Sequence, residues 1–310
     1  MSTFTEPTTA TEPTRESWLA ERRTGLGGSD APAVLGISSW STPYELWAEK
    51  SGLIEAGDLS DKECVQWGDR LEGVIGEAYA EKTGRTVTRW PKYTIARHNE
   101  HHWMICTPDA TQVGHPTNDP PGFQKRGDLQ IKTANQYKLC EWQDEPPLAY
   151  QVQLQHELAV TGDEWGTLAV LIGGQTSREF DFLRNERFIA ALMEQEEAFW
   201  DRVQSGNPPP VDGSKATTSA LLKLHPEDSG EAIDLPAEAA QWDKELAEVK
   251  ANLKALEARE NELKNQLRDA IGKATYGLLP DGGRYSWKTQ NKQGYSVAPS
   301  STRILRRLTK

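Results

Sequence analysis

The chain has 310 residues, enough to bury the core of one large domain and to carry an appendage. Its aliphatic and aromatic content of 36% is ordinary, and the longest apolar run, residues 168–172, is far too short to span a bilayer. The formal charge of −11 argues against a protein that coats nucleic acid over its whole surface, although a local DNA-binding groove stays compatible with it.

The predicted elements of the first two thirds of the chain describe an α/β domain. Residues 1–15, rich in Thr, Pro and Glu, have the composition of a disordered leader and lack the features of a signal peptide. Caps, a proline at a first turn and helical apolar spacing predict helices over 18–23, 31–35, 43–50, 63–82, 148–160 and 185–204. Strands are expected near 87–89, 93–96, 104–107, 129–133, 165–172 and 178–183. Helices around one small mixed sheet would end near Gly206.

The last third has a different pattern. Residues 214–238 are polar and Pro-rich and predict a linker, with a short helix at 217–224. From Trp242 to Leu267, apolar residues repeat at alternating steps of four and three, interrupted by Glu260. This heptad pattern fits either an amphipathic helix packed on its own chain or a helical hairpin or oligomer contact. The basic tail contains a hairpin signal at residues 280–283, and its aromatic and basic side chains would either contact DNA or pack the hairpin.

Acidic and polar residues at strand ends point to phosphodiester chemistry. Asp109 follows Thr-Pro, and about twenty residues later Asp128, Gln130 and Lys132 alternate along one expected strand. Alternate residues of a strand share a face. Mg²⁺ prefers oxygen ligands from one or two carboxylates, and a neighbouring lysine can orient the attacking water and offset charge on phosphate. Such sites usually carry a glutamate at the position of Gln130.

Other polar residues have structural explanations when taken singly. Glu72 fits a solvated carboxylate of the 63–82 helix, although it lies at the edge of the core. Gln153 faces inward on the 148–160 helix, where a buried amide needs a partner. His156 is expected to be a structural histidine and not a metal ligand. Three widely spaced cysteines (Cys64, Cys106 and Cys140) offer no CxxC metal clip and fit a reducing cytoplasm.

Together these segments resemble a known family. Arg22 to Asp30 (RRTGLGGSD), Trp67 to Glu72, Thr107-Pro108-Asp109, Gln130-Ile131-Lys132 and the run from Gln153 to Gly162 occur in the order found in YqaJ-like phage recombinases. That family belongs with lambda-type exonucleases in the PD-(D/E)XK nuclease superfamily. The resemblance covers about residues 18–213 and implies a restriction-endonuclease-like core with a small mixed sheet flanked by helices. The C-terminal heptad helix and β-hairpin tail lie outside its strongest part.

The resemblance also implies roles for individual residues. Asp109, the Gln130 side chain, the Ile131 carbonyl and Glu72 would hold Mg²⁺, with Mn²⁺ able to substitute, and Lys132 would position the nucleophilic water. Arg22 and Ser29 match the place where the family grips a 5′-terminal phosphate, and Gln153 matches the glutamine of the helix after the lysine strand. An arginine fork and the N–H groups of Gly27, Gly28 and Ser29 at a helix start suit a phosphate.

The implied activity is a magnesium-dependent 5′–3′ exonuclease on linear duplex DNA, acting in the bacterial host cytoplasm to produce 3′ overhangs for recombination. Its expected partners are DNA ends, a single-strand annealing protein and further copies of itself. Residues 16–213 would form the nuclease domain and 239–310 a helical segment with a basic tail. Gln130 departs from the family pattern, and Asp128 is the expected compensating carboxylate. The alternatives are a weakened DNA-end-binding recombination protein and a structure-specific endonuclease of the same fold.

Overall fold

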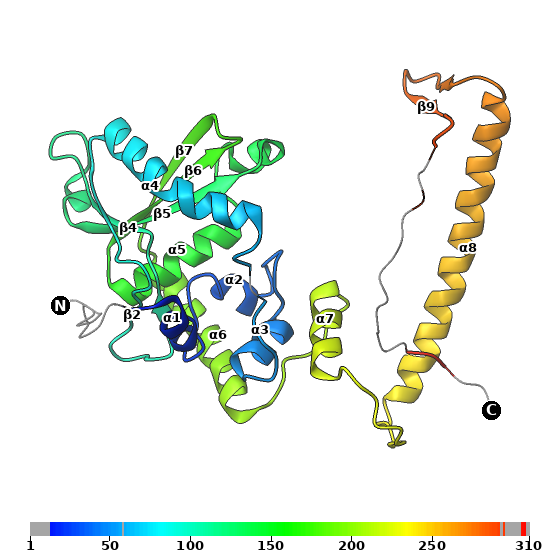
Figure 1. Ribbon diagram of the computed structural model, residues 1–310, viewed down its shortest axis with the longest axis horizontal. Coiled ribbons are helices and arrows are strands. Elements are labelled where there is room, and N and C mark those ends of the chain that lie inside the picture. Colours follow the sequence, from blue (N-terminus) through cyan, green and yellow to red (C-terminus); the bar gives the residue numbers. More distant parts are fainter. Residues whose placement is uncertain (1–12, 58, 292–293, 295–304, 308–310) are drawn as a thin grey trace. The chain divides into compact units, whose positions relative to one another are not determined.

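The computed structural model describes residues 13–57, 59–291, 294 and 305–307. It divides into two compact units, the first running to Pro226 and the second starting at Glu227 (Figure 1). The expected leader, residues 1–15, lies mostly outside the described residues. Helix α1 (Arg15–Arg22) begins at residue 15, the last residue of the expected leader. The Thr14 side chain caps that helix by accepting a hydrogen bond from the Ser17 N–H.

A five-stranded mixed sheet organises the first unit. Its strands are β1 (Thr86–Arg89), β4 (Ala110–Val113), β5 (Arg126–Ala134), β6 (Trp165–Ile172) and β7 (Thr176–Leu183), in the order β1-β4-β5-β6-β7. β5 and β6 are parallel, and the other neighbours are antiparallel. The small mixed sheet predicted from sequence is therefore confirmed, although β4 was not among the expected strands. The chain segments expected as strands at 93–96 and 104–107 contribute β2 (Ala96–Arg97) and β3 (Ile105–Cys106), which pair separately.

Helices cover both faces of this sheet. α4 (Glu63–Thr83) packs on β1, β5 and β6, whereas α5 (Leu148–Thr161) packs on β5 and β6 from the other side (Figure 1). The side chains of β5 define the two faces, because Leu129 packs with Tyr79 of α4 while Gln130 bonds to Gln153 of α5. Residues 128, 130 and 132 thus face α5, as the two-residue period of a strand requires.

The remaining helices of the first unit surround this core. They are α2 (Ala31–Val34), α3 (Pro43–Lys50), α6 (Glu186–Ser205) and α7 (Lys215–Leu224), with 3-10 helices at Pro121–Gln124 and Gln136–Trp142. α7 falls inside the segment expected to be a linker. It packs on α3, where the hydroxyls of Thr42 and Thr217 lie 3.0 Å apart and Ala220 is fully buried with Trp47. This helix therefore extends the first unit beyond Gly213.

The second unit contains one long helix and a hairpin. α8 (Ala239–Ile271) is followed by the antiparallel strands β8 (Tyr276–Leu278) and β9 (Arg284–Ser286), which flank the turn predicted at residues 280–283. No residue of α8 is buried among the described residues. Within the same described ranges, no helix is both long enough and apolar enough to cross a membrane.

Candidate active site

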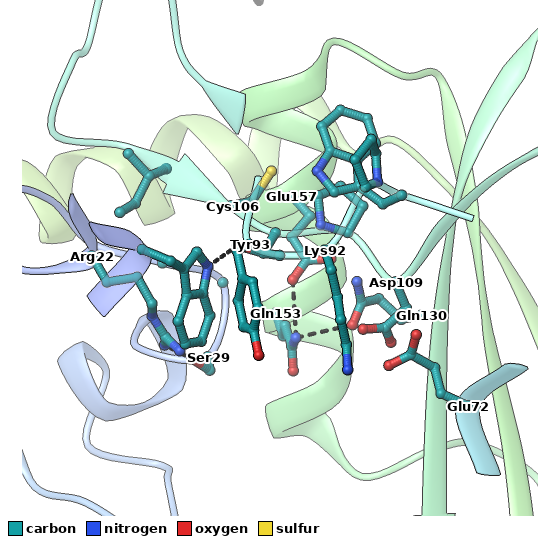
Figure 2. Close-up of a pocket in the computed structure, with 18 of the residues that line it drawn as sticks. Arg22, Ser29, Glu72, Lys92, Tyr93, Cys106, Asp109, Gln130, Gln153 and Glu157 are labelled. Atoms are coloured by element: carbon teal, nitrogen blue, oxygen red, sulfur yellow. Dashed lines mark hydrogen bonds between the residues drawn. The ribbon is translucent and has the colours of Figure 1, made fainter. Parts of the chain in front are cut away.

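A cavity of about 310 Å³ opens where the sheet meets α1, α4 and α5. Side chains from segments far apart in sequence line it, as Figure 2 shows. The glycine turn after α1, the first half of α4, the segment just before β4, the middle of β5 and the middle of α5 all contribute. The predicted site residues that line it are Arg22, Ser29, Glu72, Asp109, Gln130, Lys132 and Gln153. The structure thus brings together residues separated by more than a hundred positions.

The centre of this cavity lies where β4 separates from β5. The pairing of these strands ends at Ala110 opposite Leu129, so beyond this point the edge of β5 has no strand beside it. Asp109 immediately precedes β4, and its Oδ2 accepts a hydrogen bond from the Ile131 N–H at 2.7 Å. The carboxylate therefore replaces the missing strand as the partner of that N–H. Burial raises the pKa of Asp109, opposed by Lys132 and by the bond from Ile131.

Gln130 and Lys132 lie side by side on the α5 face. Lys132 Nζ donates to Gln130 Oε1 at 2.8 Å and lies 3.9 Å from Asp109 Oδ2. Gln153 Nε2, from α5, donates to the same Gln130 oxygen at 3.1 Å. Because two donors converge on it, the Gln130 amide is oriented with its oxygen toward the cavity and its Nε2 buried without a partner among the described residues.

Glu72 reaches the same point from α4. In Figure 2 its carboxylate points toward Asp109 and Gln130. Arg89 donates to its Oε1 at 3.3 Å, which fixes the side chain at the rim of the cavity. Burial, reinforced by the nearby Asp109 carboxylate, raises the pKa of Glu72. The structure thus places a second acid beside Asp109.

Asp128 occupies a different environment from the one its sequence spacing suggests. It shares the α5 face with Gln130 but does not line the cavity, and its exposed fraction is 1%. Burial raises the pKa of Asp128 well above its usual range, and the adjacent Glu157 carboxyl raises it further. Two buried carboxyls in contact retain a shared proton, because both cannot be ionised there at low cost.

Glu157 is a cavity residue that the sequence reasoning missed. It lies on α5 one turn after Gln153, is 2% exposed and lines the cavity. Its Oε1 accepts from Gln153 Nε2 at 2.9 Å. Burial raises its pKa to about 7, although Lys132 and the Gln153 bond oppose the shift. The i, i+4 spacing from Gln153 was the available signal, since it places both side chains on one helical face.

A separate group of residues forms the other end of the cavity. Arg22 Nη2 donates to Ser29 Oγ at 3.0 Å, and the guanidinium lies 4.8 Å from the centre of the Trp18 ring. The Gly27 N–H, expected to contribute to an anion site, donates instead to Asp30 Oδ2 at 2.9 Å. Asp30 in turn pairs with Lys50 at 2.7 Å. The Arg22 side chain is therefore a cation that a ligand at this end could reach.

His156 has the structural role expected for it. Its Nδ1 lies 2.8 Å from Glu196 Oε1 and its Nε2 2.9 Å from the Ile105 carbonyl oxygen, and both side chains are fully buried. Burial opposes protonation, but Glu196 outweighs it and raises the pKa of His156 to about 9. The imidazolium donates from both nitrogens and joins α5 to α6 and β3.

This arrangement defines a class of protein. A small mixed sheet lies between helical layers, and an acid, an amide and a lysine meet where two strands separate. The mixed sheet and its helical layers have the arrangement of the restriction-endonuclease-like fold.

Comparison with known proteins identifies the family. The YqaJ-like viral recombinase domain matches residues 17–164. YqaJ of Bacillus subtilis (strain 168) is 34% identical over 284 residues, which are 89% of this chain and 84% of that protein. Protein D345L of African swine fever virus (strain Badajoz 1971 Vero-adapted) is 31% identical over 110 residues, 35% of this chain and 27% of its own. The chain belongs to the YqaJ-like viral recombinase family.

Among solved structures, an alkaline exonuclease (LHK-Exo) from Laribacter hongkongensis is similar to this chain. The two align with a TM-score of 0.49 and 19% sequence identity, over 62% of this chain and 94% of that one.

Proposed function

We propose that this protein is a magnesium-dependent exonuclease that degrades linear duplex DNA from its 5′ end and leaves 3′ single-stranded overhangs for recombination. The observation that carries the proposal is the meeting of Asp109, Gln130 and Lys132 at the separation of β4 from β5. The family supports it, and so does the continuity of one cavity from these residues to Arg22 and Ser29.

The donor set fits a hard divalent cation. Among the described residues, no three Asp, Glu, His or Cys side chains are grouped closely enough to bind a metal by themselves. Neutral oxygens must therefore complete the set, and the Gln130 amide oxygen already points into the cavity. The Ile131 carbonyl lies on the same open strand edge as its N–H, which bonds to Asp109. Asp109, Gln130, Ile131 and Glu72 would hold the ion, which would polarise the scissile phosphate and acidify a bound water.

The side chains of the chain itself would carry the remaining work. Lys132 would orient the attacking water and offset the charge that develops on the phosphate oxygens. Arg22 would bind the 5′-phosphate through its planar guanidinium, with Ser29 holding that side chain in place. Gln153 would keep the Gln130 oxygen directed into the site. End binding at one side and chemistry at the other would make cleavage proceed from a terminus.

Residues 16–213, extended by α7, would carry the nuclease, while the helix and basic hairpin from 239 onward would bind DNA or a protein partner. A single-strand annealing protein would receive the 3′ overhang, and the nuclease would act as a homo-oligomer.

Digestion of defined DNA substrates tests the proposal. Linear duplexes with 5′-phosphate or 5′-hydroxyl ends are incubated with protein in Mg²⁺ or in EDTA, and released nucleotides are measured. We expect Mg²⁺-dependent release that is faster from 5′-phosphate ends. The Lys132→Ala variant should lose about 100-fold or more of this activity. Lys138→Ala is the matched control, because that lysine is exposed and pairs with Glu141. If the wild type releases no nucleotide under any of these conditions, the proposal that the protein is an exonuclease is refuted.

Two other functions remain as outcomes of the same assay. The neutral Gln130 motivates a weakened protein that binds DNA ends without degrading them, and this would give end binding without nucleotide release. Cleavage of closed circular or flapped duplex as fast as linear duplex would instead identify a structure-specific endonuclease.

A further inference from the structure

Glu157 has no place in the mechanism described above, yet it is built into the same cavity. Its Oε2 is buried, and no N–H or hydroxyl group in the part of the chain that the structure describes donates a hydrogen bond to it. The Glu157 carboxyl instead shares a proton with the neighbouring Asp128 carboxyl. A buried acid whose neighbour is a second acid is costly, and a cation could take the place of the shared proton. Glu157 also lies close enough to Lys132 and Asp109 for both to affect its pKa.

The contacts of Gln153 connect Glu157 to the proposed metal ligands. Gln153 Nε2 donates both to Gln130 Oε1 at 3.1 Å and to Glu157 Oε1 at 2.9 Å. Two oxygens, one from β5 and one from α5, therefore converge on a single donor. Oxygens that share one donor in this way are also placed to share one cation, after rotation of the Gln153 amide away from them.

We propose that Glu157 supplies the negative charge that Gln130 lacks and binds the divalent ion together with Asp109 and the Gln130 oxygen. This inference rests on the proposed metal-dependent function. The sequence leaves open which carboxylate supplies the charge that Gln130 lacks. In this proposal it comes from α5 and not from Asp128, which is buried and does not line the cavity. Gln153 is then a positioning residue that holds the two oxygens together while no ion is bound.

Mn²⁺ binding measured by electron paramagnetic resonance tests this role directly, without DNA. Free Mn²⁺ is titrated against full-length wild type, Glu157→Gln, the double variant Gln130→Glu/Glu157→Gln, and Glu197→Gln, an exposed glutamate of α6. Glu157→Gln should weaken Mn²⁺ affinity at least tenfold. The double variant should recover most of that loss, because the charge returns from the strand, and Glu197→Gln should match wild type.

The failure of this inference differs from the failure of the proposed function. A wild type that degrades DNA with Mn²⁺, with Glu157→Gln of unchanged Mn²⁺ affinity, would overturn the role of Glu157 alone. A wild type that neither binds Mn²⁺ nor degrades DNA would overturn both the role of Glu157 and the proposed function. If Glu157→Gln does not fold, the anomalous Mn²⁺ peak in crystals of the wild type decides. A peak in contact with the Glu157 carboxylate supports the role, and a peak out of its reach overturns it.

A second inference, independent of the nuclease site, concerns α8. Its heptad positions a and d form an exposed apolar stripe, in which Trp242, Leu246, Val249, Leu253, Leu256 and Leu263 are 44–67% exposed. With Leu246, Leu253, Glu260 and Leu267 at position a, the flanking e positions are Asp243, Lys250, Glu257 and Lys264. These flanking residues set which orientation of a second helix is favourable.

An antiparallel second copy fits these charges. Opposing a and d layers in register places residue 246 opposite 263 and residue 253 opposite 256. The e positions then pair Lys250 with Glu257 of the second copy, and Asp243, which bonds to Arg307 of its own chain at 2.9 Å, with Lys264, each twice by symmetry. A parallel copy would instead place Arg259 beside Lys264 and would face Glu260 with itself in the core. We infer that α8 forms an antiparallel two-helix coiled coil with a second copy of this chain.

Light scattering of full-length protein over a concentration series tests the pairing. The wild type should dimerise, and Leu253→Lys should abolish this, since it places a charge in the core. Lys250→Glu should raise the dimer Kd about tenfold, because it turns two attractive pairs into repulsive ones. Lys254→Glu, on the outer face of α8, is the matched control and should leave Kd unchanged.

The orientation is decided by a charge exchange. Lys250→Glu/Glu257→Lys should restore the wild-type Kd in an antiparallel pair. In a parallel pair the acid introduced at position 250 would lie beside Glu245 of the second copy, so the double variant would stay weak. A monomeric wild type, an oligomer insensitive to Leu253→Lys, or a double variant without recovery would overturn the inference.

Discussion

Adjacent glycines in the turn after α1 should respond oppositely to the same substitution. A Cβ at Gly28 would lie 2.3 Å from Glu157 Oε1, 2.8 Å from its Cγ and 3.0 Å from its Cδ. A Cβ at Gly27 would meet its nearest atoms at 3.6 Å or more, which is ordinary contact. Because neither glycine has a positive φ, the backbone tolerates alanine at both positions. The difference between the two variants therefore reports the packing of Glu157 alone.

The expected magnitude follows from this overlap. Alanine at position 28 must displace the buried Glu157 carboxylate by about 1 Å, and overpacking of this kind costs about 2 kcal/mol. For a unit of this size that corresponds to a fall in Tm of about 4 to 8 °C. Gly27→Ala should stay within about 1 °C of wild type. Thermal unfolding followed by circular dichroism measures both variants.

A double-mutant cycle assigns the effect to Glu157. In a Glu157→Ala background the space beside Gly28 is open, so Gly28→Ala should cost little there, and the coupling free energy should approach the full cost of the single variant. Equal Tm values for Gly28→Ala and Gly27→Ala would refute the reasoning, because Glu157 could then not be held against the glycine turn. An equal cost of Gly28→Ala in both backgrounds would refute it as well.

The remaining predictions concern His156 and Arg22. The pKa of His156 is about 9 in the folded state and about 6.5 in the unfolded state. Its stabilising contribution is therefore fully present below pH 6.5 and is lost as the pH rises through 9. Denaturant unfolding should show up to about 3 kcal/mol less stability near pH 10 than near pH 6. His156→Gln should lower the free energy of unfolding by about 3 kcal/mol or more, since it leaves Glu196 as an unpaired buried charge, and a loss below about 1 kcal/mol would contradict the ion pair. Arg22→Ala should remove most of the preference for 5′-phosphate over 5′-hydroxyl ends in the digestion assay, and an unchanged preference would place the phosphate elsewhere.

Much of the fold could be predicted from sequence because its elements carry strong local signals. The α3 segment has a Thr cap and a first-turn proline, and its predicted bounds agree with the structure. β4 was missed because its four residues, Ala110–Val113, are too short for an alternation pattern to stand out. α7 was assigned mainly to a linker because its neighbours are rich in proline and polar residues, whereas its place is fixed by a tertiary contact with α3.

The site shows the same division between local and tertiary information. The shared face of Asp128, Gln130 and Lys132 follows from strand geometry, and the structure has it. The depth of each residue along that face does not follow from sequence, because it depends on where α5 crosses the strand. Asp128 is therefore buried outside the cavity, whereas Glu157 lines it. Glu157 could not be singled out from sequence, because residues on nearly every side of α5 are buried.

The carboxylate of Asp109 on the Ile131 N–H has a consequence for how activity is acquired during folding. This contact exists in one alignment of β4 and β5, that of Ala110 opposite Leu129. A slip of one residue would move Asp109 off its partner and turn Gln130 and Lys132 toward α4. With the proposed site, partly folded or misaligned chains would therefore lack the catalytic arrangement, even though they contain all its residues. DNA hydrolysis would then report whether β4 and β5 are correctly aligned. A newly synthesised chain would not cleave the DNA around it until its sheet is correctly paired.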